Sequence, residues 1–209
     1  NPSSATFGSE LLKLTASDAA SWDNFGESVS IDGDYAVVGA YGVDDKGSSS
    51  GSAYIFKQQP DGTWLETTKL LASDGASDDD FGGSVAISGT TALVGAYSDD
   101  NGEQSGSAYI FEKQEDGSWL ETAKLLASDG ASYDSFGYSV AISGNTAIVG
   151  AYADDDNGSN SGSAYLFDTT GAQMLISWML MARTTAIYLF PLSFMAMAPT
   201  ANSRSGCPK

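Results

Sequence analysis

The sequence contains no histidine and a single cysteine, Cys207, among its 209 residues. Without histidine, neither a Ser-His-Asp triad nor a histidine metal site can form, and one cysteine cannot make a disulfide within the chain. Paired carboxylates are abundant, so residue type alone leaves a glycoside hydrolase open. Because these acids repeat along the chain, whereas a catalytic pair is normally unique, we expect the protein not to be an enzyme.

Basic residues are also scarce. Nine Lys and Arg stand against 27 Asp and Glu, which gives a formal net charge of −18. Nucleic-acid binding needs Lys and Arg to neutralise phosphate, so this function is not expected. The acidity is compatible with cation binding or with simple solubility. Since 42% of the residues are hydrophobic, the chain can still bury a core.

The charges divide the chain into two segments. No acidic residue follows Asp168, while both arginines and all five methionines lie beyond it. The N-terminal "NPSSATFGSE" has neither a basic start nor an apolar run, so it does not have the pattern of a signal peptide. The difference in composition predicts that the two segments are under different constraints.

Three internal repeats occupy the first segment. "FGESVSIDGDYAVVGAY" at 25–41 matches "FGGSVAISGTTALVGAY" at 81–97 and "FGYSVAISGNTAIVGAY" at 136–152. The Phe-Gly pairs are spaced by 56 and 55 residues, and the "KLTASD" or "KLLASD" stretches have the same spacing. Such a period is the signature of a repeat architecture.

Each repeat has the pattern of β-strands. "SVAIS" and "TALVGA" alternate apolar and small or polar residues and are joined by a short glycine-containing turn, which predicts a hairpin. "GSAYIF" predicts a third strand and "WLETTKLLA" or "WLETAKLLA" a fourth. A helix is the alternative for the fourth segment, since Leu, Glu, Ala and Lys favour helices. We expect a strand, because its neighbours are short strands joined by hairpin turns.

Four antiparallel strands in a unit of this length are typical of a β-propeller blade. We therefore predict an all-β fold with about three blades in an open or incomplete propeller. The predicted organisation is the end of a preceding blade and a linker at 1–24, blades at 25–80, 81–135 and 136–172 (the last one incomplete), and an atypical apolar segment at 173–209.

The repeated motifs resemble the FG-GAP repeat in its bacterial form. Phe136-Gly137 matches the FG, and Gly150-Ala151-Tyr152 stands where the family often has Gly-Ala-Pro. The resemblance covers residues 9–168 and implies an integrin-α-like propeller that binds ligands or mediates adhesion, usually outside the cell. The chain departs from the family in two ways. The link between the FG and GAP strands is a tight turn where integrin repeats often carry a calcium loop, and three blades are too few for a closed ring.

An acidic loop follows each "GAY" and is the first candidate site. Calcium prefers six to eight hard oxygens, which carboxylates, Asn side chains and backbone carbonyls on a glycine-turned loop can supply. The spacing is not that of an EF-hand, and a solvated turn in an acidic protein is the alternative. The candidate calcium ligands are Asp44, Asp45, Asp99, Asp100, Asn101, Asp154, Asp155, Asp156 and Asn157, with the third loop as the best candidate.

A second acidic stretch precedes each Phe-Gly pair, with Asp18, Asp74 and Asp129 at one repeated position. Asp23, Asp79 and Asp134 follow in the same stretch, in a less regular alignment. Because the stretch recurs in every repeat, we expect a structural role such as capping a turn with a carboxylate, with metal binding as the alternative. The recurring aromatic residues are expected to pack between blades, with a carbohydrate-stacking platform as the alternative. They are Phe25, Phe81, Phe136, Tyr54, Tyr109 and Tyr165, with Trp64 and Trp119 beside the outer turns.

The segment after the third repeat lacks the expected fourth strand and the next Phe-Gly pair. Residues 174–198 are apolar over a length that could cross a bilayer, but Arg183 and Pro191 would lie inside the span, where both are unfavourable. A terminal cap on the last blade and an out-of-frame translation of another repeat are the other two explanations. A membrane partner is expected only if the anchor is genuine.

The sequence as a whole predicts a binding or adhesion module that works in the extracellular space or at the cell surface. Its ligand would be a protein or a carbohydrate, with calcium as a candidate stabilising ion. A structural spacer or envelope scaffold is the alternative function, and a hydrolase carried on a propeller is a weaker one.

Overall fold

The computed structural model describes residues 8–99 and 104–169. The chain divides into two compact units, Asn1–Thr170 and Gly171–Lys209, and only the first contains described residues. The atypical segment at 173–209, with its three explanations, lies outside the described residues, and so do Asp100 and Asn101.

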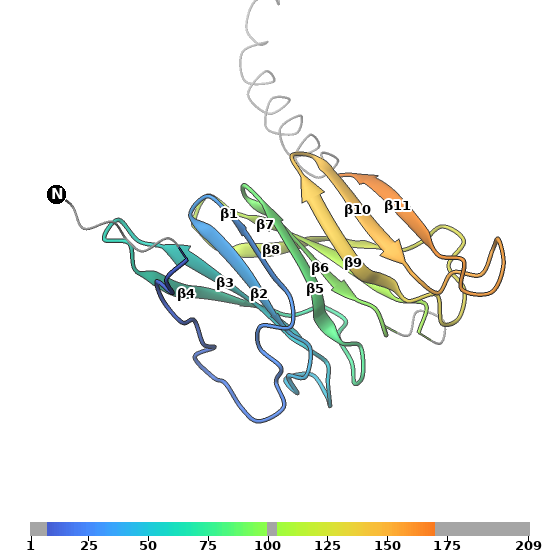
Figure 1. Ribbon diagram of the computed structural model, residues 1–209, viewed down its shortest axis with the longest axis horizontal. Coiled ribbons are helices and arrows are strands. Elements are labelled where there is room, and N and C mark those ends of the chain that lie inside the picture. The colour runs from blue at the N-terminus through green and yellow to red at the C-terminus, as the bar shows by residue number, and fades with distance from the viewer. Residues whose placement is uncertain (1–7, 100–103, 170–209) are drawn as a thin grey trace, which may run out of the picture. The chain divides into compact units, whose positions relative to one another are not determined.

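The described residues form eleven strands and no helix, so the all-β prediction is confirmed. The strands fall into three antiparallel sheets, each of which we number by its place in the chain (Figure 1). The first sheet contains β1 (Val29–Asp32), β2 (Tyr35–Ala40), β3 (Ser52–Gln58) and β4 (Trp64–Leu70). The second contains β5 (Phe81–Ser88), β6 (Thr91–Ala96), β7 (Ser107–Lys113) and β8 (Trp119–Leu125), and the third contains β9 (Phe136–Ser143), β10 (Thr146–Ala151) and β11 (Ser163–Asp168).

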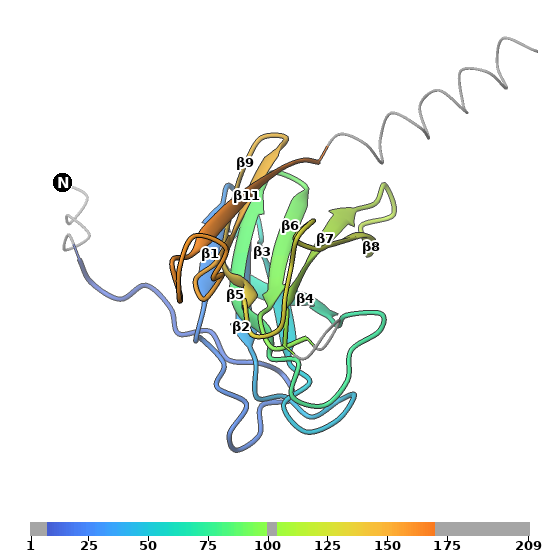
Figure 2. The same ribbon diagram turned by 90° about the vertical axis from the view of Figure 1, so that its right-hand side faces the viewer.

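Within each sheet the strands follow chain order, as in a propeller blade. The order is β1-β2-β3-β4 in the first sheet and β5-β6-β7-β8 in the second, which Figure 2 shows from the side. The segments "WLETTKL" and "WLETAKL" are the strands β4 and β8, so the helical alternative was wrong. The described part of the third sheet has only three strands, with β11 at one edge.

The hairpins at the start of each sheet have the predicted tight turns. Gly33, Gly89 and Gly144 have φ angles of 54°, 58° and 55°, in the left-handed region that glycine enters without a steric penalty. The turns keep a register in which Asp32 pairs with Tyr35, and Ser88 with Thr91. Because the register is fixed, successive side chains of a strand point to opposite faces of the sheet. The alternation of residue types in the sequence therefore gives the sheet two faces of different composition.

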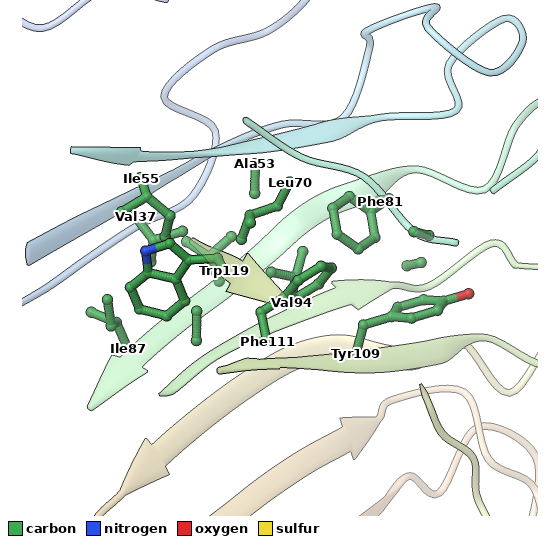
Figure 3. Close-up of a cluster of buried hydrophobic side chains, with 14 residues drawn as sticks. Val37, Ala53, Ile55, Leu70, Phe81, Ile87, Val94, Tyr109, Phe111 and Trp119 are labelled. Carbon is green, nitrogen blue, oxygen red and sulfur yellow. The ribbon is translucent and has the colours of Figure 1, made fainter. Parts of the chain in front are cut away.

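Consecutive sheets pack face to face through buried apolar side chains. Val37 and Ile55 of the first sheet lie against Ile87 and Trp119 of the second in one buried cluster (Figure 3). A second cluster joins Leu93 and Ile110 of the second sheet to Phe136 and Val149 of the third. The predicted packing role between blades is confirmed for Phe81 and Tyr109, which are fully buried in the first cluster, whereas Phe25 and Tyr165 are only half-buried.

The sheets approach closely at one glycine in each interface. A Cβ at Gly39 would lie 1.9 Å from the carbonyl oxygen of Gly82, and a Cβ at Gly95 would lie 2.0 Å from that of Gly137. Beside these contacts the Ser28 hydroxyl donates to the Gly82 carbonyl at 2.8 Å, and the Ser84 hydroxyl donates to the Gly137 carbonyl at 2.7 Å. Glycine in the "GA" motif is therefore required by the stacking of one repeat on the next.

In the part of the chain that the structure describes, no helix has the length and apolar character needed to cross a membrane.

Candidate functional site

The antiparallel strand order brings two sets of loops to the same end of each sheet. The acidic loops at 41–51, 97–106 and 152–162 join the second strand to the third, and the connections between sheets begin where the fourth strand ends, at this same end. Backbone hydrogen bonds link the two sets, such as Asp78 N to Ser48 O at 2.7 Å and Ala153 N to Asp134 O at 3.3 Å. Any ligand bound at this end therefore meets loops from neighbouring repeats.

A lysine lies between two aspartates in the first loop cluster. The Lys69 ammonium, from β4, is 2.6 Å from a carboxylate oxygen of Asp18 and 2.5 Å from one of Asp45. The Tyr54 hydroxyl donates to Asp18 at 2.9 Å, and Lys69 lies 5.2 Å from the centre of the Tyr54 ring. The hydrogen bond from Lys69 lowers the pKa of Asp18, while burial raises the pKa of Tyr54 to about 12.

The second loop cluster repeats this arrangement deeper in the protein. Lys124, from β8, is 2.7 Å from Asp74 and 2.9 Å from Asp99, and the side chain of Asp99 is only 7% exposed. The Tyr109 hydroxyl lies within hydrogen-bond distance of both aspartates and can donate its one proton to either. Burial of the Tyr109 hydroxyl, followed by its hydrogen bond to Asp99, raises its pKa, so it stays neutral and donates.

The third cluster has the aspartates and the tyrosine, but no lysine reaches it from the described residues. The Tyr165 hydroxyl lies 2.9 Å from a carboxylate oxygen of Asp129 and 2.8 Å from one of Asp154, and it can donate its one proton to either. The charges of Asp154 and Asp129 raise the pKa of nearby Asp156, as expected where carboxylates gather without a counter-ion. The hydrogen bond from the Asp156 backbone amide lowers the pKa of Asp154.

These clusters account for several of the predicted calcium ligands. Asp45, Asp99 and Asp154 lie in the clusters, whereas Asp44 accepts from the Ser49 backbone amide, and Asp155 and Asn157 are exposed. Among residues 8–99 and 104–169, no group of three or more acidic, His or Cys side chains is arranged to hold a metal ion. In the first two clusters a lysine already neutralises the carboxylates. The calcium sites stay a prediction, and the third loop is the one in which the chemistry of the donor set fits calcium best.

The carboxylates just before each Phe-Gly pair cap turns. Asp23, Asp79 and Asp134 each accept a hydrogen bond from the backbone amide three residues earlier, at 2.7, 2.6 and 2.6 Å. An aspartate that satisfies a nearby backbone amide fixes the local turn. The predicted structural role therefore applies to this second acidic position, while Asp18, Asp74 and Asp129 belong to the tyrosine clusters.

Sequence reasoning missed a row of tyrosines at the same end of the sheets. A hollow of about 300 Å³ is lined by Glu27, Tyr41, Gly83, Tyr97 and Tyr138, and we call it the tyrosine hollow. The Tyr97 and Tyr138 rings meet edge to face, with centroids 5.5 Å apart, and Tyr138 also contacts Tyr152 at 4.4 Å. The hollow therefore combines residues from three repeats.

Two repeat positions build the tyrosine hollow. The third residue of "FGxS" is Glu27, Gly83 or Tyr138, and the last residue of "GAY" is always tyrosine. A Cβ at Gly83 would lie 2.7 Å from the Tyr97 ring, so a glycine at this position leaves the room that the ring needs. Burial, followed by the charge of Asp80, raises the pKa of Tyr97, whereas Tyr138 and Tyr152 are 52% and 57% exposed. A tyrosine in the place of the family's usual proline was the sequence signal for this hollow.

Comparison with known proteins supports the repeat assignment. A family model described as FG-GAP repeat matches residues 9–56, 64–111 and 119–167. A search of curated proteins found no match. The three family matches together cover more than half of the chain, and each begins at the fourth-strand motif rather than at the Phe-Gly pair.

Proposed function

The chain belongs to the FG-GAP repeat family, and from this premise we propose that it is a non-enzymatic binding module that acts outside the cell or at its surface. The tyrosine hollow is the observation that carries this proposal. It is formed by the same two positions of successive repeats, and the Tyr138 ring in its lining is 52% exposed.

The chemistry of the hollow favours a ligand with positive charge. Its lining contains Glu27 and three tyrosines, with Asp80 behind Tyr97, and it contains no lysine or arginine. Tyrosine faces attract ammonium and guanidinium groups, and the net charge of −18 adds a long-range attraction. Tyrosine is also enriched where proteins bind one another. We therefore propose a protein ligand that presents Lys or Arg side chains, with adhesion as the biological role.

A carbohydrate is the second candidate, because Tyr138 and Tyr152 present exposed rings next to a carboxylate. Sugars commonly bind through their apolar faces on such rings and their hydroxyl groups on carboxylates. The two candidates differ in their dependence on salt. Binding of a basic segment weakens as ionic strength rises, and binding of a neutral sugar does not.

An array of basic peptides and neutral oligosaccharides, followed by titration calorimetry of the hits, tests this function. We expect Tyr138→Ala to weaken binding about 10-fold or more, as loss of a tyrosine at the centre of an interface does. Tyr133→Ala is the matched control, because Tyr133 is 61% exposed and takes no part in the hollow. Equal affinities of both variants and the original protein would reject the hollow as the binding site. A spacer or scaffold is favoured if the array shows no binding at all.

We also propose calcium as a stabilising ion at the third loop. Asp129, Asp154 and Asp156 gather negative charge there. No described lysine neutralises it, whereas Lys69 and Lys124 neutralise the aspartates of the other two clusters. Thermal unfolding with millimolar calcium and, separately, magnesium measures this directly. A rise of the melting temperature with calcium alone supports the ion site, and no rise with either ion rejects it.

A further inference from the structure

The exposed faces at the two ends of the described stack match the faces that are buried inside it. Leu166 of β11 is 72% exposed, whereas Ile55 and Ile110, at the same repeat position, are 0% and 4% exposed. Ile148 is 41% exposed, and its counterpart Leu93 is fully buried. The outer face of the third sheet therefore has the residues of an interface between sheets but, among the described residues, no sheet against it.

The first sheet shows the opposite face. Val29 and Ile31 of β1 are 68% and 66% exposed, while Val85 and Ile87, their counterparts in β5, are 7% and 5% exposed. Val85 and Ile87 owe their burial to the first sheet, which packs against them. The first sheet thus presents the face that would fit the outer face of the third.

Residues 9–16 carry the pattern of a fourth strand without pairing as one. "SELLKLTA" aligns with "LETTKLLA" of β4 and its C-terminal extension, and the family match that starts at residue 9 corresponds to those that start at 64 and 119. Leu14 and Ala16 pack in a buried cluster with side chains of the first sheet, just as Leu70 and Ala72 pack in a buried cluster with side chains of the second. Upstream of them, Leu11 and Leu12 are 92% and 53% exposed.

We propose that the chain associates head to tail with a second copy of itself. Residues 9–14 of one copy form a fourth strand on the edge of β11 in the other, where no described strand pairs, and the two end sheets pack together as consecutive repeats do. Strand addition of this kind is a common mode of recognition, because the edge supplies unpaired backbone donors and acceptors. The register follows from the pairs Tyr54 with Lys69 and Tyr109 with Lys124, and it aligns Tyr165 with Lys13.

The polar groups at the two ends are complementary in the same register. Lys13 arrives at Asp129 and Asp154, which have no lysine among their described neighbours. In the first two clusters a lysine at this place is paired with two aspartates. The association thus adds a cation to a cluster that has none among its described neighbours, and Lys13 would compete there with the calcium ion proposed above.

Two further pairs repeat between sheets and extend to the ends. Ser17 and Ser73 each donate from their amide and hydroxyl groups to a glutamate of the next fourth strand, Glu66 or Glu121, at 2.7 or 2.8 Å. Ser128 holds the same repeat position and would receive Glu10 of the second copy. Ser139 is the exposed counterpart of Ser28 and Ser84, and its hydroxyl would donate to the carbonyl of Gly26 in the second copy.

We call the exposed face of the first sheet, together with residues 9–14, the head, and the outer face and edge of the third sheet the tail. The interface is heterologous, because it joins the head of one copy to the tail of another. Such contacts close into a ring if the rotation between copies permits it and otherwise continue as an open chain. Repulsion between copies of net charge −18 opposes the association over long range. Added salt screens that repulsion, so we expect assembly to strengthen as ionic strength rises.

Sedimentation velocity of the full chain over a range of concentrations tests the proposal. We expect concentration-dependent oligomers, which Leu166→Asp at the tail and Val29→Asp at the head each weaken about 100-fold or more, as a charge buried in an apolar contact does. Leu120→Asp is the matched control, since Leu120 is an exposed leucine of β8 outside the proposed interface, and it should assemble normally. All three substituted residues are more than half exposed, so each variant should fold, and circular dichroism verifies that it does.

A mixture of the two defective variants identifies the direction of the contact. The Leu166→Asp protein keeps an intact head and the Val29→Asp protein an intact tail, so together they should form a heterodimer and nothing larger. Lys13→Glu should weaken assembly, and Lys57→Glu, a charge reversal away from this interface, should not. A chain that stays monomeric at every concentration overturns the proposal, and so does assembly that Leu166→Asp and Val29→Asp leave unchanged.

Discussion

The second and third sheets have nearly the same sequence but differ in burial. "SAYIF" in β7 is buried at all five positions, whereas "SAYLF" in β11 alternates between half-buried and exposed residues. The second sheet lies between two others, and the third has a described neighbour on one side only. The difference shows that in this repeat protein the neighbouring sheet, rather than the local sequence, decides which apolar side chains form the core.

The largest expected difference between the two sheets comes from their central apolar residues. Ile110→Ala should lower the free energy of unfolding by about 3 kcal/mol, because it opens a cavity between the second and third sheets. Leu166→Ala should change it by less than about 0.5 kcal/mol in the monomer, because that side chain is 72% exposed. Urea denaturation at low protein concentration measures both, and equal losses would contradict the comparison.

The glycines of the "GA" motif give the next contrast. Gly95→Ala should cost about 2 kcal/mol, since its methyl group would lie 2.0 Å from the backbone of the next sheet. At Gly150 the contact closer than 3 Å is the Ser139 hydroxyl oxygen of its own sheet, which can rotate away, so Gly150→Ala should cost less. Thermal unfolding of the two variants decides this, and a Gly150→Ala variant at least as unstable as Gly95→Ala would refute it.

Loss of the lysine should give a smaller difference in stability between the first two clusters than the glycine variants do. Lys124→Met leaves Asp99, which is 7% exposed, without its cation and should cost about 2 kcal/mol. Lys69→Met affects Asp18 and Asp45, whose side chains are 48% and 40% exposed, so its cost should be below about 1 kcal/mol. Urea denaturation at neutral pH gives both values.

The pH dependence of these variants follows from the pKa shifts. Although burial opposes it, the hydrogen bond from Lys124 holds the pKa of Asp74 below its usual value. Its contribution to stability is therefore present above about pH 4 and is lost as the pH falls through the lowered pKa. The partner hydrogen bonds raise the pKa of Lys124 despite burial, so its contribution is lost as the pH rises through that pKa. The gap between the original protein and Lys124→Met should shrink in acid below about pH 4, and a gap that widens there would be evidence against this ion pair.

Much of the fold could be predicted from the sequence, because a period near 55 residues and strict alternation determine the strands and their faces. The contacts between repeats could not. Asp18 and Lys69 recur with the same period, but the period does not say which copy of the lysine meets which copy of the aspartate. The tyrosine hollow was missed for the same reason, since Tyr138 meets the Tyr97 ring of the preceding repeat only after the sheets have stacked.

The central claim is that the outer face and edge of the third sheet form an interface between sheets that another copy completes. Amide hydrogen exchange of the full chain at low and high protein concentration tests it most directly. At low concentration, we expect the amides of β11 to exchange much faster than those of β3 and β7, and at high concentration to be protected like them. Protection of β11 that equals β3 and β7 at low concentration, or that does not rise with concentration, would contradict the claim.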